Sequence, residues 1–296
     1  MKKLDFIVLG AQKSGTTTIF QLLSEHPRVF VPAGKELPFF VRDDVTSESY
    51  QAFISEHYKG KLNSFVIGKL TPHYLSDPRV PERLLSLSNK TLLIAILRDP
   101  VERAFSHYRM SVRRGIEKRN FTEAIDQMLD SDALIYARAL PTGRASENQT
   151  YIVWGEYGRL LQFYAKKIAK GEMLLLSTRK LESEPEYTIR QLLEYLGLEI
   201  VTLPSLGKKM HQGGTKERLP LQAIAKSLAP IKWLWRKLPN TKKQCILFQV
   251  EQWNVVKSVA SLNDVPVETV ERLREHFASD TKLIKDLTGW QPDWPK

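Results

Sequence analysis

The chain has 296 residues, 42% of them hydrophobic, with 44 basic and 33 acidic side chains and a formal net charge of +11. This length is sufficient for one large core, so we expect a single domain over residues 1–296 rather than two independent domains. The basic surplus is compatible with nucleic acid, an anionic membrane surface or a polyanionic substrate or cofactor. Composition alone does not choose among these partners.

The cysteine content and the N-terminus disfavour several classes of protein. Cys245 is the single cysteine, which excludes an intrachain disulfide and a cysteine-rich metal site and indicates a reducing compartment. The first predicted strand begins almost at once, which leaves no room for a signal peptide. No run of about 18 apolar residues occurs to span a membrane. We therefore expect a cytoplasmic protein.

The first motif is a strand, a loop and a helix near the N-terminus. An apolar run at residues 6–9 leads into the sequence GAQKSGTTT at 10–18, and an amphipathic run follows. Gly10 and Gly15 permit a tight turn, and backbone N–H groups that converge at the start of a helix bind anions. We predict a phosphate-binding loop, whose ligands are Lys13, Ser14, Gly15, Thr16, Thr17 and Thr18.

The loop departs from the nucleotide-triphosphatase pattern G-x-x-x-x-G-K-[ST] at one position. Gly10 and Gly15 keep the spacing of that pattern, but Thr16 replaces its lysine. The lysine occurs inside the loop instead, as Lys13. No Asp at the end of a later strand is placed to hold Mg²⁺, so we expect no metal. A P-loop nucleotide kinase is the alternative, and it fits the sequence less well.

Residues 10–17, GAQKSGTT, resemble the 5′-phosphosulfate loop of sulfotransferases that use 3′-phosphoadenosine 5′-phosphosulfate (PAPS). The segment is most similar to the branch that contains the heparan sulfate N- and O-sulfotransferases and their bacterial relatives. Animal members of that branch carry a membrane anchor, and its absence here resembles the soluble, bacterial-type members. The resemblance implies a P-loop-like, three-layer α/β/α fold with a central, mainly parallel sheet. It also implies PAPS as the donor, without a metal.

A second segment follows residues 91–97, the most continuous apolar run in the chain, which predicts a central strand buried on both faces. The sequence RDPVERAFSHY at 98–108 resembles the family's 3′-phosphate segment, R-[DN]-P-x-x-R-x-x-S. Arg98 matches the residue that pairs with the 3′-phosphate, and Ser106 matches the hydroxyl beside it. A dianionic phosphate is bound well by a fixed guanidinium and a neutral donor, which agrees with both assignments.

Two further segments resemble the family's catalytic positions. Glu36, in the sequence GKELPFF at 34–40, matches the general base that takes the acceptor's proton, although by itself it is typical of a solvated loop charge. Lys69 follows a predicted strand and matches the lysine of E-K-[ST]-P-x-Y, which stabilises the transferring group. Gly68 replaces the Glu of that segment. His73, at a variable position of the segment, is the alternative base.

Two basic segments follow in the C-terminal part of the chain. The loop at 208–220 resembles a loop of the family that closes over the nucleotide. This resemblance assigns Lys216 and Arg218 to donor binding, although a solvated loop explains them equally well. Residues 226–243 carry six basic and no acidic residues with two tryptophans, inside an insertion at about 221–262. They are a lid over the acceptor, a surface for a membrane or anionic polymer, or a helix packed through its tryptophans.

Other apolar periods predict a strand and several helices. The strand is expected at 173–177, and the helices are expected within 41–63 and at 100–112, 121–129, 155–170, 185–196 and 267–287.

Together these features predict a PAPS-dependent sulfotransferase that moves the sulfuryl group to a hydroxyl or amine by in-line displacement. The acceptor is a glycan, a glycolipid or a small molecule. Lys13 and Lys69 neutralise charge on the oxygen between sulfur and the 5′-phosphate, and Glu36 acts as the base. The rival from another class is a basic module that binds anionic polymers or membranes. It does not require Arg98 and Ser106 beside a phosphate loop, and we expect no nucleic-acid partner.

Overall fold

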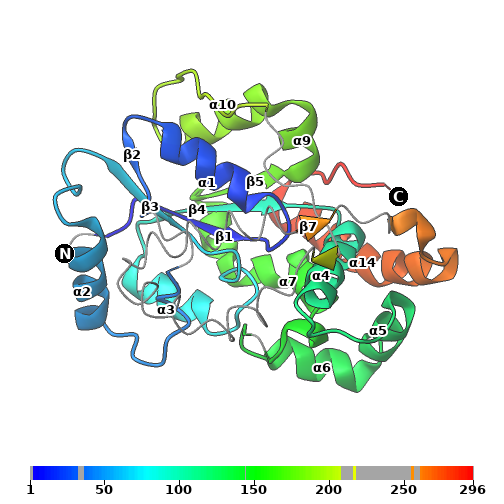
Figure 1. The fold of residues 1–296 in the computed structure, drawn as a ribbon. Coiled ribbons are helices and arrows are strands. Elements are labelled where there is room, and N and C mark those ends of the chain that lie inside the picture. The colour runs from blue at the N-terminus through cyan, green and yellow to red at the C-terminus, as the bar shows by residue number, and fades with distance from the viewer. Residues whose placement is uncertain are drawn as a thin grey trace, which may run out of the picture.

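The computed structural model describes residues 3–32, 37–143, 145–207, 216–217, 255–256 and 261–295. Its centre is a five-stranded sheet made of β1 (Phe6–Gly10), β2 (Val29–Phe30), β3 (Val66–Leu70), β4 (Leu92–Leu97) and β5 (Met173–Ser177). The strands lie in the order β2-β3-β1-β4-β5, and each neighbouring pair is parallel. Helices cover both faces of the sheet (Figure 1), which confirms the predicted parallel α/β/α architecture.

The strands are nearly continuous apolar runs because both faces of the sheet are covered. Every residue of β1 is buried, and so is every residue of β4 after Leu92. Successive side chains of a strand point to opposite faces. Phe6 and Val8 therefore join one hydrophobic cluster. Ile7 and Leu9 join the other.

One face of the sheet packs against α1 (Thr16–Glu25), α9 (Thr178–Ser183) and α10 (Pro185–Tyr195). The buried side chains of these helices recur at three- and four-residue intervals, which is typical of amphipathic helices. They are Ile19, Leu22, Leu23, Leu181, Ile189, Leu192 and Leu193. The helix predicted at 185–196 is confirmed, with its end one residue earlier.

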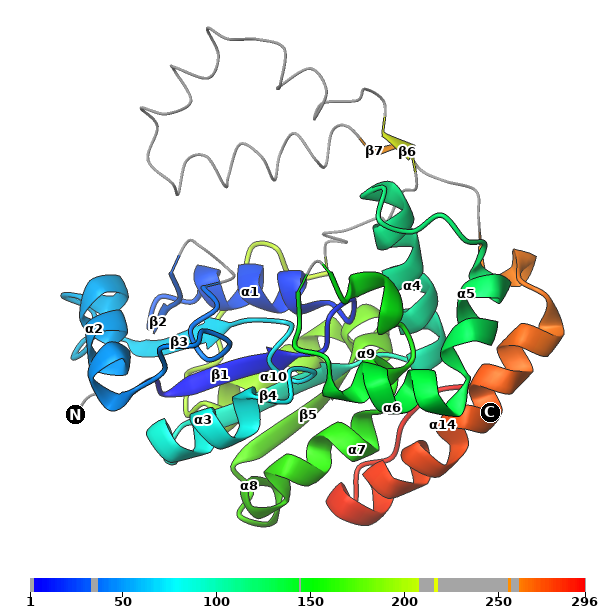
Figure 2. The ribbon, with the colours of Figure 1, turned by 90° about the horizontal axis from the view of Figure 1, so that it is seen from below.

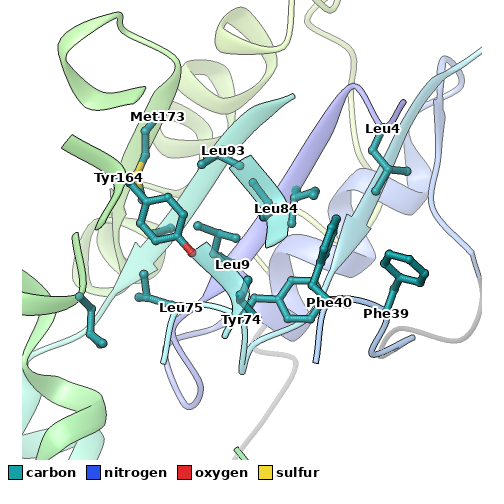
Figure 3. Packing of buried hydrophobic residues seen from close by; sticks show 14 of the residues in the cluster. Leu4, Leu9, Phe39, Phe40, Tyr74, Leu75, Leu84, Leu93, Tyr164 and Met173 are labelled. Atoms are coloured by element: carbon teal, nitrogen blue, oxygen red, sulfur yellow. The ribbon is translucent and has the colours of Figure 1, made fainter. Parts of the chain in front are cut away.

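The opposite face packs against α2 (Ser47–Tyr58), α3 (Val80–Leu87), α7 (Tyr157–Leu161), α8 (Ala165–Ala169) and α14 (Val267–Thr288). Figure 3 shows part of this core, including Phe39, Phe40 and Tyr74. The ring centroids of Phe39 and Phe40 are 5.2 Å apart and those of Phe40 and Tyr74 are 5.5 Å apart, both edge to face. Such edge-to-face pairs add to the stability gained from burial alone.

A further group of helices lies at one end of the sheet, beside α14 (Figure 2). It consists of α4 (Pro100–Arg113), α5 (Phe121–Met128) and α6 (Ser131–Ala139). Val101 and Phe105 of α4 share a hydrophobic cluster with Phe121 of α5 and Phe277 of α14. In both views the antiparallel pair β6 (Lys216–Glu217) and β7 (Val255–Val256) lies near α4.

The segment predicted as one helix at 155–170 is interrupted. It consists of 3-10 turns at Val153–Gly155 and Gln162–Tyr164, with α7 and α8 following them. Phe163, expected to point inward, is 53% exposed, so that expectation is wrong. The change of helical pitch within the 3-10 turn turns Phe163 outward while it keeps Tyr164 buried.

Some expectations fall partly or wholly outside the described residues. The basic stretch at 226–243 lies outside them, and the predicted insertion at 221–262 is described only at 255–256 and 261–262. Within the parts of the chain that the structure describes, no helix is both long and apolar enough to cross a membrane.

Gly68 of β3 lies where a larger residue cannot fit. A Cβ atom added at Gly68 would come within 2.0 Å of the Phe6 ring on neighbouring β1. The Gly68 carbonyl also accepts a hydrogen bond of 2.9 Å from the Tyr58 hydroxyl. The glycine that replaces the family's Glu at this position is therefore required by the packing of Phe6 against β3.

We predict that Gly68→Ala lowers the free energy of unfolding by about 1–3 kcal/mol, because the added methyl group overpacks the core against Phe6. Chemical denaturation measures the change. Gly143→Ala is the control, since a Cβ at Gly143 meets nothing within 4 Å. Equal stability of Gly68→Ala and the wild type would contradict this account of the packing.

Candidate active site

The predicted site segments meet at the carboxyl ends of three neighbouring strands, β3, β1 and β4. The chain runs from β1 outward to β2, returns through β3, and then crosses to β4 on the other side of β1. Ligands of open parallel sheets bind where the strand order reverses in this way. The loop at 10–18 follows β1, residues 71–74 follow β3, and Arg98 follows β4.

Backbone geometry explains both glycines of the loop. Gly10 has φ +151°, and a Cβ there would lie 2.7 Å from the carbonyl oxygen of Pro72. Gly15 has φ +96° and is the N-cap of α1, without a side-chain cap. The first turn of α1 consists of Thr16, Thr17 and Thr18, and the Thr18 amide donates to the Gly15 carbonyl at 3.0 Å. The backbone amides at the start of a helix favour an anion, so this end of α1 is suited to a phosphate.

Lys13 and Ser14 occupy different positions within this loop. Lys13 is half-buried and has φ +71°, an uncommon conformation for a residue other than glycine. Such conformations persist where the surrounding structure holds them, and they cluster at ligand sites. Ser14 is fully buried, so its side chain supports the loop rather than facing its surface.

Hydrogen bonds fasten the loop to its neighbours. The Ala11 amide donates to the Ile96 carbonyl at 2.8 Å. The Thr178 hydroxyl, at the start of α9, lies 2.7 Å from the Ser14 carbonyl and 3.0 Å from the Leu97 carbonyl. Thr178 therefore joins the end of β5 to the loop and to the end of β4. Sequence reasoning missed this residue, because nothing in its local pattern points to a partner 164 residues away.

Arg98 lies just before α4, and Ser106 lies in the middle of this helix. Asp99 caps this helix by accepting a 2.9 Å hydrogen bond from the Glu102 amide. The Arg98 guanidinium is partly exposed and pairs with Glu102, with an Nη2–Oε2 distance of 2.9 Å. Ser106 lies one helical turn beyond Glu102, on the same side of the helix. The structure thus brings Arg98 and Ser106 to one side of α4.

Lys69 is buried inside the core rather than at the loop surface. Its Nζ lies 5.1 Å from the Phe53 ring centroid and 5.6 Å from that of Tyr74. Lys69 pairs in register with Ile7, three residues before Gly10. An ammonium over two rings is stabilised by their quadrupoles.

The structure does not describe Glu36 and Arg218, and it describes Lys216 only as backbone of β6. The residues that follow Glu36 are fixed by Tyr74. The Phe40 amide donates to the Tyr74 hydroxyl at 3.1 Å, and this hydroxyl donates to the Leu37 carbonyl at 3.3 Å. Burial raises the pKa of Tyr74 well above its ordinary range, so the hydroxyl remains protonated. Segment 37–40 is therefore held at the carboxyl end of β3.

A group of rings that the sequence did not suggest surrounds His73. The ring centroids of His73 and Trp154 are 5.6 Å apart, and Trp154 stacks on His107 at 4.9 Å. Burial lowers the pKa of His107 well below its usual value, and the charges of Arg103 and Lys13 lower it further. His107 is therefore a neutral imidazole near Lys13. Trp154 and His107 lie on segments whose proximity only the fold reveals.

Glu156 fixes the segment that carries Trp154. Its carboxylate is 3% exposed and contacts Arg138 at 2.7 Å, Arg159 at 2.5 Å and His276 at 3.0 Å. Burial alone raises the pKa of Glu156, but hydrogen bonds from His276 and Arg138 and the charge of Arg159 lower it to about 2. One carboxylate thus joins α6, α7 and α14.

Comparisons with known proteins identify the family. A model described as "Sulfotransferase domain" matches residues 3–212. "Membrane-associated sulfotransferase kil1" of Dictyostelium discoideum is 36% identical over 109 residues, which cover 37% of this chain and 23% of that protein. Mouse "Heparan sulfate glucosamine 3-O-sulfotransferase 3B1" is 27% identical over 194 residues, which cover 65% of this chain and 46% of that protein. The chain thus spans less than half the length of these curated relatives.

A solved structure supports the fold. The crystal structure of a sulfotransferase from Alicyclobacillus acidocaldarius superposes with a TM-score of 0.66 and 18% identity, covering 99% of this chain and 98% of that one. The chain is a member of the sulfotransferase domain family, which confirms the resemblance seen in residues 10–17 and 98–108. Membership of this family implies PAPS as the sulfuryl donor.

We predict that Glu156→Gln destabilises the protein at pH 7 by about 3 kcal/mol, because the pKa of Glu156 falls from an ordinary 4.5 to about 2 on folding. A lowered pKa gives stability that is complete above 4.5 and is lost as the pH falls toward 2. The difference between wild type and variant should therefore shrink below pH 4.5. Denaturation at several pH values measures it, with exposed Glu275→Gln as the control. A difference that does not change with pH would contradict the assignment.

Proposed function

We propose that this chain transfers the sulfuryl group of PAPS to a hydroxyl or amine of a glycan, a glycolipid or a small molecule. The observation that carries the proposal is that the loop at 10–18 follows β1 and Arg98 follows the neighbouring strand β4, with Ser106 in the helix after Arg98. One phosphate-binding element would hold the 5′-phosphosulfate, and the other would hold the 3′-phosphate. A donor with phosphates at both positions matches this pair of elements.

The donor is held by the chain's own residues without rearrangement of the fold. The first-turn amides of α1 and the Lys13 ammonium surround the 5′-phosphosulfate. Arg98 exchanges its contact with Glu102 for the 3′-phosphate, and Ser106 donates a neutral hydrogen bond to the same group. This selects PAPS over ATP, which lacks a 3′-phosphate. Lys216 and Arg218 are proposed to close over the nucleotide.

Sulfuryl transfer places developing negative charge on the oxygen between sulfur and the 5′-phosphate. Lys13, within the loop, is proposed to neutralise that charge as the bond to sulfur breaks. Lys69 adds positive charge from the core beside the loop, and its position over Phe53 and Tyr74 supports an electrostatic role more than a direct contact. The reaction is an in-line displacement, and positioning of donor and acceptor supplies much of its rate.

The acceptor is activated by a base at the carboxyl end of β3. Glu36 is proposed for this role, since Tyr74 fixes the segment directly after it. His73 follows β3 and lies beside Trp154, which makes it the alternative base. A base must come within hydrogen-bonding distance of the acceptor's proton.

The net charge of +11 favours an anionic glycan among the acceptors. The relatives named as heparan sulfate sulfotransferases agree with this preference. We further propose that the enzyme acts in the cytoplasm and uses no metal.

Calorimetric binding of 3′,5′-ADP, with ATP and Mg²⁺ as the comparison, tests the identity of the donor. If the protein binds ATP with Mg²⁺ more tightly than 3′,5′-ADP, the chain is better interpreted as a nucleotide kinase. Tight binding of DNA or liposomes, insensitive to 3′,5′-ADP, would replace it with a basic binding module.

We predict that Lys13→Ala and Arg98→Ala each weaken 3′,5′-ADP binding at least tenfold, since a hydrogen bond to a charged group contributes roughly 1.5–3 kcal/mol. Titration calorimetry measures the affinity. Lys59→Ala and Arg190→Ala remove exposed cations and should leave the affinity unchanged. If Lys13→Ala and Arg98→Ala both bind 3′,5′-ADP as tightly as the wild type, the assignment of these residues to the donor site is wrong.

We predict that Glu36→Gln retains 3′,5′-ADP affinity and loses at least a hundredfold in turnover, because general-base catalysis contributes roughly 10²–10⁴-fold. The readout is sulfuryl transfer to a panel of glycan and phenolic acceptors. The matched variant is His73→Gln. Near-normal turnover of Glu36→Gln together with loss in His73→Gln would assign the base to His73.

A further inference from the structure

Arg103 of α4 carries a fully buried positive charge. Its side chain has 0% exposure and lies one turn into the helix that follows Arg98. The Arg103 Nη2 donates to the carbonyl oxygen of Tyr151, and its Nη1 lies 3.5 Å from His107 Nδ1. Its Nε has no hydrogen-bond partner. Both partners of this guanidinium are neutral.

The buried carboxylates Asp99 and Glu156, near this end of the sheet, pair with cations other than Arg103. Asp99 pairs with Arg274, and Glu156 pairs with Arg138 and Arg159. Within the described residues no carboxylate pairs with Arg103. An isolated charge in a protein interior is strongly disfavoured unless a countercharge or a set of hydrogen bonds compensates it. An arginine at such a position therefore points to a countercharge outside the described residues.

Arg103 remains cationic despite its burial. Burial lowers the pKa of Arg103 to about 10, the nearby Tyr157 phenol raises it, and Arg98 lowers it. At neutral pH the guanidinium is therefore protonated. Burial also keeps His107 neutral, as described above, so His107 adds no second positive charge beside Arg103.

Two neutral side chains connect Arg103 to the phosphate loop. Tyr157 is fully buried, and burial raises its pKa, whereas Arg103, Ser14 and the Arg98 backbone lower it. Tyr157 belongs to the same hydrophobic cluster as Leu9 and Ala11, at the start of the loop, and Leu97, at the end of β4. His107 lies beside Arg103 and stacks on Trp154, which contacts the ring of His73 after β3. Buried neutral side chains thus connect Arg103 with the segments that follow β1, β3 and β4.

We propose that the countercharge of Arg103 is the phosphosulfate anion bound in the loop at 10–18, so that Arg103 is a positioning residue for the donor. The inference rests on the proposed function. Arg103 touches no ligand atom; it acts through the field that it sets up across Tyr157 and His107. In this low-dielectric region a fixed charge acts over several ångströms with little screening. Its contribution to binding depends on the charge of the ligand.

The test compares ligands that differ in charge. Calorimetry is carried out on the full chain with 3′,5′-ADP, which has two phosphates, with 5′-AMP, which has one, and with adenosine, which has none. Weak ligands are measured by competition against 3′,5′-ADP. The variants are Arg103→Gln, which keeps a donor for the Tyr151 carbonyl, Arg103→Met, which is apolar, and Arg103→Lys, which keeps the charge. Exposed Arg190→Gln is the control.

We expect the neutral variants to lose roughly 10- to 100-fold in affinity for 3′,5′-ADP, less for 5′-AMP, and none for adenosine. Arg103→Lys should recover most of the affinity for 3′,5′-ADP. An equal loss for all three ligands, or no loss for any, would overturn the inference. A purely structural role predicts the equal loss, because distortion of the site does not depend on ligand charge.

The stability of the ligand-free variants gives a second readout. If Arg103 lacks a countercharge in the free protein, Arg103→Met should unfold at or above the wild-type temperature without ligand. Failure of both neutral variants to fold would overturn the inference, since the charge would then belong to the scaffold. Absence of 3′,5′-ADP binding to the wild type would overturn the proposed function as well. Wild-type binding with an equal loss for all ligands in the variants would overturn this inference alone.

Discussion

Strand β1 lies between β3 and β4, and its loop is bonded to both neighbours. The Ala11 amide donates to the Ile96 carbonyl of β4, and the Leu75 amide, beyond β3, donates to the Leu9 carbonyl. Gly10 lies so close to the Pro72 carbonyl that no side chain fits there. The three segments that form the site therefore share one set of backbone contacts. A shift of any one strand would displace the loop that follows β1.

The charges around this loop are distributed unevenly. The described carboxylates nearby pair with cations other than Arg103: Asp99 with Arg274, Glu102 with Arg98, and Glu156 with Arg138. His107 and Tyr157 are neutral because burial disfavours their charged forms. Among the described residues no carboxylate pairs with Arg103, so the part of the core around it has a positive potential. A site of this kind favours ligands with several negative charges.

The sequence was sufficient to predict the parallel sheet and the places of the loop at 10–18 and of Arg98 after their strands, because each depends on local patterns. Apolar runs predicted β1 and β4, and the spacing of Gly10 and Gly15 predicted the loop between β1 and α1. Thr178, Trp154 and His107 could not be found in this way, since their roles depend on contacts between distant segments. The inward position expected for Phe163 was wrong because a 3-10 turn changes the helical period there. The roles of the site residues stay predictions, including those of Lys13, Glu36, Lys69, Arg98 and Ser106.

The contact between Asp99 and Arg274 has a consequence for the organisation of the whole chain. Asp99 caps α4 directly after Arg98, and its second oxygen accepts from a side chain of α14, 175 residues later. The helix that closes the chain thus orients the residue next to the proposed 3′-phosphate ligand. If Arg98 binds the 3′-phosphate as proposed, recognition of the nucleotide depends on how α14 packs against the start of α4. Substitutions in α14 would therefore change the affinity for the donor through Asp99, although the helix itself contacts no ligand in this proposal.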